Sequence, residues 1–588
     1  MKSIIKDNLL IVTVIFCLLL MLSFPHLYRF LQLGKNYTIL FFDNPVATQT
    51  NWEETYTYAT EANRIKNNQP INDTYIYEYR NEPSPLISEL VPSVLLGVPA
   101  KVLSIPLVFI LAKIFVLPLT IFIWYLIARQ IGYSKKASLC AALTSFILQK
   151  LFVYIPYFPK MFSYEFDGYL EAQRTYFPLI SSVITSIIIL FILNLLNNNK
   201  MKYVLFAGIL LGLLFFTYFF AWSLIWLSLI LFLISLKISS WQIHVKKLLA
   251  VLAIGLLIGL PYFINTFYFY QNPAHGDFLV RTISFPITNW NIPIIFRFLA
   301  LSLIMIAFQK QWFKDPSRRL LLTVYLTAAL LPMASMMIFQ ADNQTDHWYE
   351  RFLYPLSTFL LVLFISDALG QFNLKIKKIV LLGLILAAFL KVLVVTVKEV
   401  QKPIAGFTIG KERTDLYSWM LKNLPKDSVV GSLSFTEEVY LTAYTPFYAY
   451  IPQAYKTIAP SNEILKRYAN LAQIFNVNEE FIGQVFIMPD EKHKNPQSLV
   501  AADGGSFMVL TGTTYIFEKP PYAGHREVLD KVLSSIDNKT RQQGKLDYLL
   551  FGPLERENTD NFSQNKCKSL YSNGVYQLYD FNTCKLSI

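Results

Sequence analysis

The chain has 588 residues, of which 54% are hydrophobic and 15% charged, and its mean hydropathy is +0.40. A soluble domain carries about 25% charged residues, and apolar runs long enough to cross a bilayer recur here, so the composition excludes a soluble globular protein. The net charge is +13, but Lys and Arg stand in short groups between apolar runs, which argues against a nucleic-acid partner and is typical of topology signals.

The N-terminus carries Lys2 and Lys6 and then an apolar run from Leu9 to Phe24. Because no small-x-small cleavage site follows, we interpret this run as an uncleaved first helix with a cytoplasmic N-terminus. A long polar loop, residues 34–100, comes next. Its last part, residues 86–99, is amphipathic and bounded by proline, and we expect it on the membrane surface.

Further apolar runs bring the prediction to about eleven transmembrane helices. After the first, they are expected at residues 102–128, 137–157, 176–196, 203–219, 221–236, 248–268, 291–308, 320–339, 352–369 and 379–397. The 203–236 stretch is too long for one helix and short for two. With the N-terminus inside, the cytoplasmic loops carry more Lys and Arg than the short outside loops, as the positive-inside rule requires.

Beyond residue 397 the pattern changes to that of a soluble domain. Helices are expected at 416–424, 464–475 and 526–543, and strands at 429–435, 507–517, 548–551 and 574–581. The predicted organisation is an all-α polytopic membrane domain, residues 1–397, with the large first outside loop 34–100, and an extracytoplasmic α/β domain, residues 398–588. If this tail is outside the cytoplasm, Cys567 and Cys584 can pair as a disulfide.

The first outside loop is the most informative place for chemistry, because a long polar loop is costly to order without a purpose. Glu53 and Glu54 open an expected helix at residues 50–67, and Asp43 precedes it. These carboxylates are candidates for a catalytic base or for metal ligands. The alternatives are that Glu53 and Glu54 only stabilise a helix N-terminus and that Asp43 is a turn residue.

Three other outside loops carry candidate ligands. Glu165 and Asp167 form an acid-x-acid pair that suits a divalent cation such as Mg or Mn, or else a solvated loop. Arg174, Arg351 and Arg281 are candidate phosphate clamps, because guanidinium matches phosphate geometry, and His347 is near Arg351 in sequence. For each Arg, ordinary headgroup contact is the alternative. Few ionisable residues fall inside the membrane runs, which argues against a transporter.

The layout resembles the GT-C class of polytopic membrane glycosyltransferases. The stretches that carry the resemblance are TNWEETYTYATEANRIKNNQPIND at 50–73, RTYFP at 174–178, HWYERFLYP at 347–355, WMLKNLPKDSVV at 419–430 and LDYLLFGPLER at 546–556. The acidic pair here is Glu-Glu where the family has Asp-Glu or a similar motif, so Glu53, Glu54 and Asp43 all stay open as the equivalent acid.

The resemblance implies a GT-C fold in the cell membrane and transfer of a sugar, with inversion, from a polyprenyl-phosphate-linked donor on the extracytoplasmic face. It also implies a carboxylate base, with Arg or a metal ion on the leaving phosphate. The acceptor class, whether glycan, lipid or protein, stays open. The alternatives are a non-enzymatic membrane protein that presents its outer domain to envelope partners, and a lipid or solute carrier.

Overall fold

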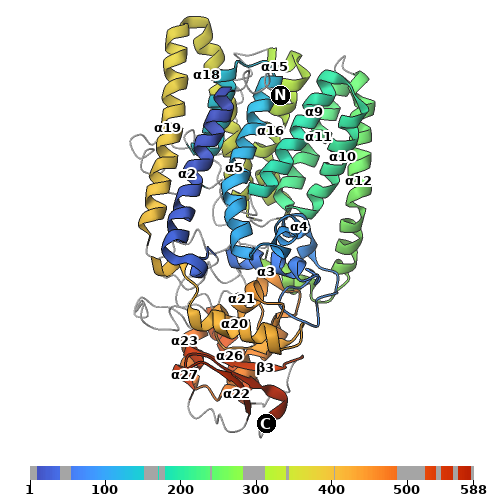
Figure 1. The fold of residues 1–588 in the computed structure, drawn as a ribbon. Coiled ribbons are helices and arrows are strands. Elements are labelled where there is room, and N and C mark those ends of the chain that lie inside the picture. The colour runs from blue at the N-terminus through green and yellow to red at the C-terminus, as the bar shows by residue number, and fades with distance from the viewer. Residues whose placement is uncertain are drawn as a thin grey trace. The chain divides into compact units, whose positions relative to one another are not determined.

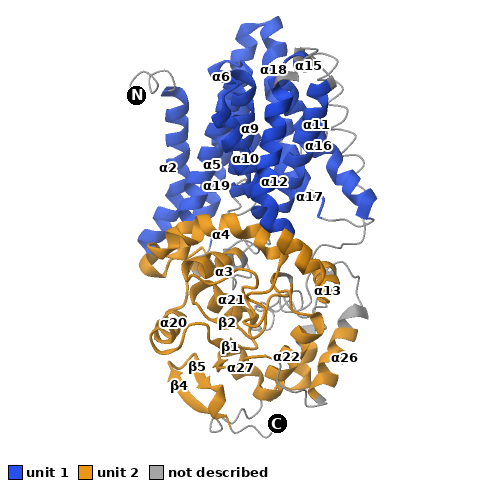
Figure 2. Cartoon of the chain, turned by 90° about the vertical axis from the view of Figure 1, so that its right-hand side faces the viewer, with its two compact units in different colours: residues 1–32, 110–263, 286–402 blue, residues 33–109, 264–285, 403–588 orange. Residues whose placement is uncertain are grey.

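The computed structural model describes residues 9–39, 55–150, 170, 179–238, 242–282, 311–339, 344–402, 404–486, 523–537, 544–559 and 567–584. The chain divides into two compact units, coloured separately in Figure 2. Unit 1 comprises residues 1–32, 110–263 and 286–402, and unit 2 comprises residues 33–109, 264–285 and 403–588. The first outside loop, which the sequence assigned to the membrane domain, therefore belongs to the same unit as the C-terminal segment.

Unit 1 is built from helices (Figure 1). In chain order they are α2 Leu9–Leu33, α5 Ile105–Gln130, α6 Lys135–Ile147, α9 Ser181–Asn198, α10 Met201–Leu213, η8 Leu214–Phe216, α11 Phe219–Ile238, α12 Gln242–Tyr270, α15 Gln311–Lys314, α16 Pro316–Phe339, α17 Asp346–Trp348, the π-helix η9 Tyr349–Leu353, α18 Tyr354–Phe372 and α19 Leu374–Gln401. Among the described residues, eight helices are long and apolar enough to cross a membrane, which confirms a polytopic membrane protein.

These eight correspond to eight of the eleven expected helices. The run expected at 137–157 is described only as the short helix α6, and the one at 203–219 is α10, continued by η8 to Phe216. The run expected at 291–308 lies outside the described residues. The doubtful 203–236 stretch is therefore two helices, and the break between them falls at residues 214–218.

Two pairs of glycines bring α10 and α12 together (Figure 1). On α10, a Cβ at Gly212 would lie 2.5 Å from the Cβ of Ile258 and 2.6 Å from the backbone oxygen of Gly255. Gly208 of α10 is similarly close to Ile254 of α12, and Gly259 of α12 to Phe215 of η8, which continues α10. Because apolar side chains gain nothing by leaving lipid, such close backbone approach is what stabilises helix pairs in a membrane.

Unit 2 combines helices with one sheet. Its helices are α3 Thr55–Lys66, α4 Leu90–Gly97, α13 His275–Thr282, α20 Lys411–Asn423, α21 Phe435–Tyr444, α22 Ser461–Phe475, α23 Glu479–Phe486, α26 Ala523–Asp537 and α27 Pro553–Asn558, with short 3-10 turns η1 Gly34–Asn36, η3 Pro85–Glu89, η4 Pro99–Lys101, η10 Ile404–Phe407, η11 Ala454–Lys456 and η15 Phe581–Thr583. Its strands are β1 Val429–Gly431, β2 Tyr448–Ala449, β3 Tyr548–Phe551, β4 Lys568–Ser572 and β5 Gln577–Asp580.

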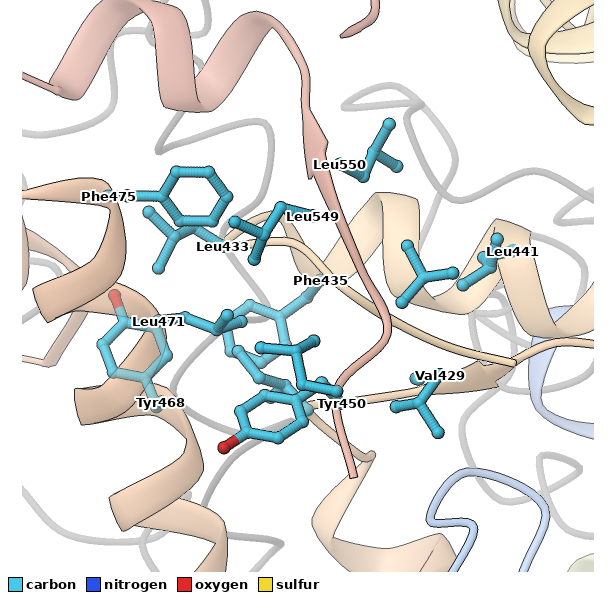
Figure 3. Packing of buried hydrophobic residues seen from close by; sticks show 14 of the residues in the cluster. Val429, Leu433, Phe435, Leu441, Tyr450, Tyr468, Leu471, Phe475, Leu549 and Leu550 are labelled. Carbon is cyan, nitrogen blue, oxygen red and sulfur yellow. The ribbon is translucent and has the colours of Figure 1, made fainter. Parts of the chain in front are cut away.

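The strands form one sheet in the order β2-β1-β3-β5-β4. β1 runs parallel to both β2 and β3, whereas β5 is antiparallel to β3 and β4. Figure 3 shows the core on this sheet, in which Leu549 of β3 lies beside Phe475 of α22, while Val429 of β1 lies on the side of Leu441 of α21. The structure confirms an α/β fold for the C-terminal segment.

Most local predictions in this segment agree with the structure. The strand expected at 548–551 is β3, and the helix expected at 464–475 is α22. The strand expected at 429–435 is shorter, because the Ser434 hydroxyl accepts a hydrogen bond from the Glu437 N–H and caps α21. The strand expected at 507–517 lies outside the described residues. Cys567 and Cys584 form the predicted disulfide.

Candidate functional site

Three of the predicted site residues lie in the described part of the chain. They are His347 and Arg351 in unit 1 and Arg281 in unit 2. The others lie outside the described residues and stay predictions: Glu53, Glu54, Asp43, Glu165, Asp167 and Arg174.

The structure brings His347 and Arg351 together and adds Tyr218, which the sequence did not indicate. His347 belongs to α17 and Arg351 to the π-helix η9, one turn later, while Tyr218 lies between η8 and α11. The Tyr218 hydroxyl is 2.8 Å from His347 Nδ1, and Arg351 Nη2 is 3.0 Å from His347 Nε2. Arg351 Nη1 also donates to the Tyr218 hydroxyl. We call these three residues the Arg351 cluster.

Aromatic side chains hold the cluster from the side of α11. The Phe220 ring lies edge-to-face on His347 with ring centroids 4.7 Å apart, and at the same distance from Trp348. The Trp348 indole N–H donates to the backbone oxygen of Phe220 at 3.2 Å. Since these contacts join α17 to the start of α11, they fix where His347 and Arg351 lie. π-helical turns such as η9 are frequent at functional sites.

Arg351 is a buried cation, with only 5% of its surface exposed. Among the described residues no carboxylate forms an ion pair with it, and its hydrogen-bond partners are a phenol and an imidazole. A buried charge is normally paired, because an isolated ion in a low-dielectric environment is strongly disfavoured. The arrangement is therefore suited to an anion from outside the described chain.

A small cavity within unit 1 has Arg351 in its lining. Its lining includes Trp124 of α5 and Ser182, Thr185 and Ser186 of α9. The Trp124 indole N–H donates to Ser186 Oγ at 2.7 Å, and the buried Thr185 hydroxyl has no hydrogen-bond partner in the described part of the chain. Its volume of about 20 Å³ is enough for one water molecule and most of its lining is apolar, so the cavity offers no room for a substrate.

Arg281, the third candidate phosphate clamp, is occupied by the protein itself. Its guanidinium donates to the backbone oxygens of Thr457 and Ala459 at 2.9 and 2.7 Å, and to the hydroxyl of Ser461 at 3.2 Å. Burial lowers the pKa of Arg281 to about 10, although Asp277 and Asp73 act in the opposite direction. Arg281 thus fastens α13 to the segment 457–461 inside unit 2.

Two acids of the first outside loop also make structural contacts within unit 2. Asp73 accepts hydrogen bonds from the N–H groups of Tyr75 and Ile76 and from the hydroxyl of Thr457. Burial raises the pKa of Asp73 to about 6, and these hydrogen bonds limit the rise. Glu78 pairs with Arg467 of α22 at 3.0 Å. Together these contacts explain why the loop and the C-terminal segment form one unit.

A second group of acids lies at the carboxyl ends of β1 and β3. Glu555 accepts from the Ser432 hydroxyl at 2.6 Å and from the Leu433 and Gly552 N–H groups at 2.7 and 2.9 Å. Glu438 accepts from the Ser432 N–H at 2.8 Å. Burial raises the pKa of both Glu438 and Glu555. In open parallel sheets ligands bind at this edge. Here the Glu555 carboxylate accepts the hydrogen bonds from the hydroxyl and N–H groups at the edge.

The described residues hold no group of three or more His, Cys, Asp or Glu that could bind a metal ion. Because Glu165 and Asp167 lie outside these residues, the predicted cation site stays a prediction.

No protein-family profile and no curated protein matches the chain. Among solved structures, it is similar to the archaeal oligosaccharyltransferase AglB from Archaeoglobus fulgidus in complex with an inhibitory peptide and a dolichol-phosphate, at 13% identity and a TM-score of 0.45, over 93% of this chain and 70% of that one. It is also similar to ArnT from Cupriavidus metallidurans bound to undecaprenyl phosphate, at 11% identity and a TM-score of 0.42, over 98% of each chain.

Proposed function

We propose that the chain is a membrane glycosyltransferase that transfers a sugar from a polyprenyl-phosphate-linked donor to an acceptor on the extracytoplasmic face. The observation that carries the proposal is Arg351, a buried cation at the first turn of a membrane-spanning helix, held by neutral partners and without a carboxylate among the described residues. A lipid phosphate arriving from the bilayer supplies the missing anion, and guanidinium binds phosphate through paired donors.

The disulfide supports the orientation. Disulfides persist in oxidising compartments and are rare in the cytosol, so the Cys567–Cys584 bond favours an extracytoplasmic unit 2 and, with it, a cytoplasmic N-terminus. The segment η3–α4–η4 separately supports the predicted position of residues 86–99 at the membrane surface. It buries Leu96 and Gly97 but exposes Leu95, Val98 and Val102, as expected for a segment that lies on a membrane surface.

The proposed reaction needs a base for the acceptor hydroxyl and positive charge for the departing phosphate. The acceptor hydroxyl attacks the anomeric carbon while the bond to the phosphate oxygen breaks, which inverts the configuration. Glu53, Glu54 or Asp43 takes the hydroxyl proton, a role that contributes roughly 10²–10⁴-fold. Arg351, with Arg174, stabilises the negative charge of the departing phosphate. A divalent cation, if Glu165 and Asp167 hold one, would supply further positive charge to stabilise the departing phosphate.

The test is a transfer assay with the purified full-length protein in liposomes. A panel of polyprenyl-phosphate-linked sugars is supplied, and sugar transfer to extracted envelope glycans, lipids and proteins is measured. Arg351→Ala is expected to abolish transfer, and Arg351→Lys to leave a small fraction of it, because a point charge cannot replace the paired donors. Substituting Glu53, Glu54 and Asp43 singly by their amides identifies the base.

A matched control is Arg319→Ala, which removes an Arg of α16 that is outside the proposed site. This variant is expected to retain transfer. Full activity of Arg351→Ala at normal expression, or of all three acid variants, would remove the proposed active site. Transport of the lipid-linked sugar without transfer would favour a carrier instead.

A further inference from the structure

The Arg351 cluster contains enough contacts to assign its hydrogen atoms. Guanidinium nitrogens are donors only, so the 3.0 Å contact between Arg351 Nη2 and His347 Nε2 requires that Nε2 accept the hydrogen bond. Nε2 therefore carries no hydrogen. A neutral imidazole has one N–H, which must then be on Nδ1, and Nδ1 is 2.8 Å from the Tyr218 hydroxyl.

The Tyr218 oxygen consequently accepts two hydrogen bonds, one from His347 Nδ1 and one from Arg351 Nη1. Its own hydrogen is turned away from both partners. In the described part of the chain, the remaining N–H groups of Arg351 have no acceptor. The cluster thus presents the N–H donors of one cation, Arg351. The contacts of its Nη1 and Nη2 with Tyr218 and His347 fix the orientation of the guanidinium.

We propose that His347 serves this site as a neutral acceptor protonated on Nδ1, and that Tyr218 is a positioning residue that aligns His347 and Arg351 for an anionic phosphate. This inference deepens the proposed function and rests on it for the identity of the phosphate. In this role His347 orients Arg351 and contributes no second positive charge.

Protonation of His347 is incompatible with the observed contacts. An imidazolium carries hydrogens on both nitrogens, so its Nε2–H would face an N–H of Arg351 and place two cations in contact. The described groups that face the His347 nitrogens are Tyr218 and Arg351, and the Phe220 ring covers one edge. Glu350 stands three residues later in the chain. The site is therefore expected to lose its alignment when acid pH forces a second proton onto the His347 ring.

Nitrogen NMR tests the assignment without requiring activity. The chain has six histidines, so ¹⁵N-histidine protein and its His347→Gln variant identify the His347 signals by difference. At neutral pH, Nε2 is expected to resonate as a ring nitrogen without hydrogen, and Nδ1 as one that carries hydrogen. Tyr218→Phe should shift both signals, whereas Tyr203→Phe, a matched change on α10, should leave them in place. An Nε2–H tautomer or an imidazolium at neutral pH would overturn the proposal.

The transfer assay tests the positioning role. Tyr218→Phe keeps the ring and removes the hydroxyl, so we expect kcat/KM to fall roughly ten- to hundredfold, the range for one hydrogen bond to a charged group, mainly through KM for the donor. In His347→Gln an amide oxygen can accept from Arg351 at every pH, so the part of the activity loss at acid pH that His347 causes should disappear. An acid limb that is unchanged between wild type and His347→Gln contradicts the role of His347, because only the limb due to the carboxylate base should remain in the variant. If the wild-type protein transfers no sugar, the proposed function fails, and the NMR result alone decides the hydrogen assignment.

Discussion

Glu61 in the first outside loop allows a sharp prediction, because its surroundings fix its protonation state. Its Oε1 lies 2.8 Å from Lys456 Nζ, and Glu89 also binds this ammonium. Ser93 Oγ contacts both Glu61 Oε2, at 3.1 Å, and the backbone oxygen of Glu89, at 2.6 Å. The Tyr58 ring lies over the ammonium at 4.6 Å. Glu61 and Lys456 are both buried.

The serine has one hydrogen for these two contacts. The backbone oxygen of Glu89 can only accept and is the closer partner, so we assign the Ser93 hydrogen to it, and a protonated Glu61 can then donate from Oε2 to Ser93 Oγ. We therefore expect Glu61 to be protonated, in agreement with burial and the Glu89 carboxylate, both of which raise its pKa well above the ordinary value. Burial lowers the pKa of Lys456, but Glu61 and Glu89 outweigh it and raise that pKa overall. The group is thus one ammonium, one carboxylate and one neutral acid.

Three substitutions separate these roles. Glu61→Gln keeps the neutral form and its shape, so the free energy of unfolding at pH 7 should change by no more than about 1 kcal/mol, the scale of one hydrogen bond between neutral groups. Glu89→Gln removes the carboxylate that balances Lys456, and Lys456→Met removes the cation. Each breaks a buried ion pair, which should cost about 3–5 kcal/mol.

The pH dependence follows from the raised pKa of Glu61. A raised pKa contributes stability that is fully present below the unfolded value of 4.5 and is lost as the pH rises through the folded value. Glu61→Gln does not titrate, so its stability relative to the wild type should improve as the pH rises through the raised pKa of Glu61. Thermal unfolding in detergent, followed by intrinsic fluorescence at several pH values, measures this. If Glu61→Gln is as destabilised as Glu89→Gln, Glu61 is ionised and the hydrogen assignment is wrong.

Three further predictions concern other parts of the chain. Gly212→Leu should disrupt the contact of α10 with α12 and lower the unfolding temperature by several degrees, whereas Gly383→Leu on α19, where a Cβ meets nothing within 4 Å, should be tolerated. Replacing both Cys567 and Cys584 by Ser should destabilise unit 2 by about 3 kcal/mol, the loop-entropy value for the 17-residue separation, which unfolding under non-reducing conditions would detect. Glu438→Gln should make unit 2 less sensitive to alkaline pH, because burial raises the pKa of Glu438 and its ionisation opposes folding as the pH rises; unchanged alkaline unfolding would contradict this.

Much of the fold could be predicted because its signals are local. A membrane helix such as α19 can be predicted from one apolar run, and β3 from a short apolar segment between polar residues. The helix α21 was missed because its first residues continue an apolar strand pattern, and only the Ser434 cap separates the two. The membership of the first outside loop in unit 2 rests on contacts such as Glu78 with Arg467, across almost 400 residues, that no local pattern encodes.

The candidate site shows the same division between local and distant information. His347 and Arg351 stand one helical turn apart, so their proximity could be read from spacing alone. Tyr218 comes from a different helix pair, and its only local signal is that it sits at the break in a run too long for one helix and too short for two. Breaks of this kind place polar groups at the end of a membrane span without burying them in lipid. A tyrosine at such a break, opposite an arginine at the start of another span, is therefore a pattern to look for in polytopic chains before coordinates exist.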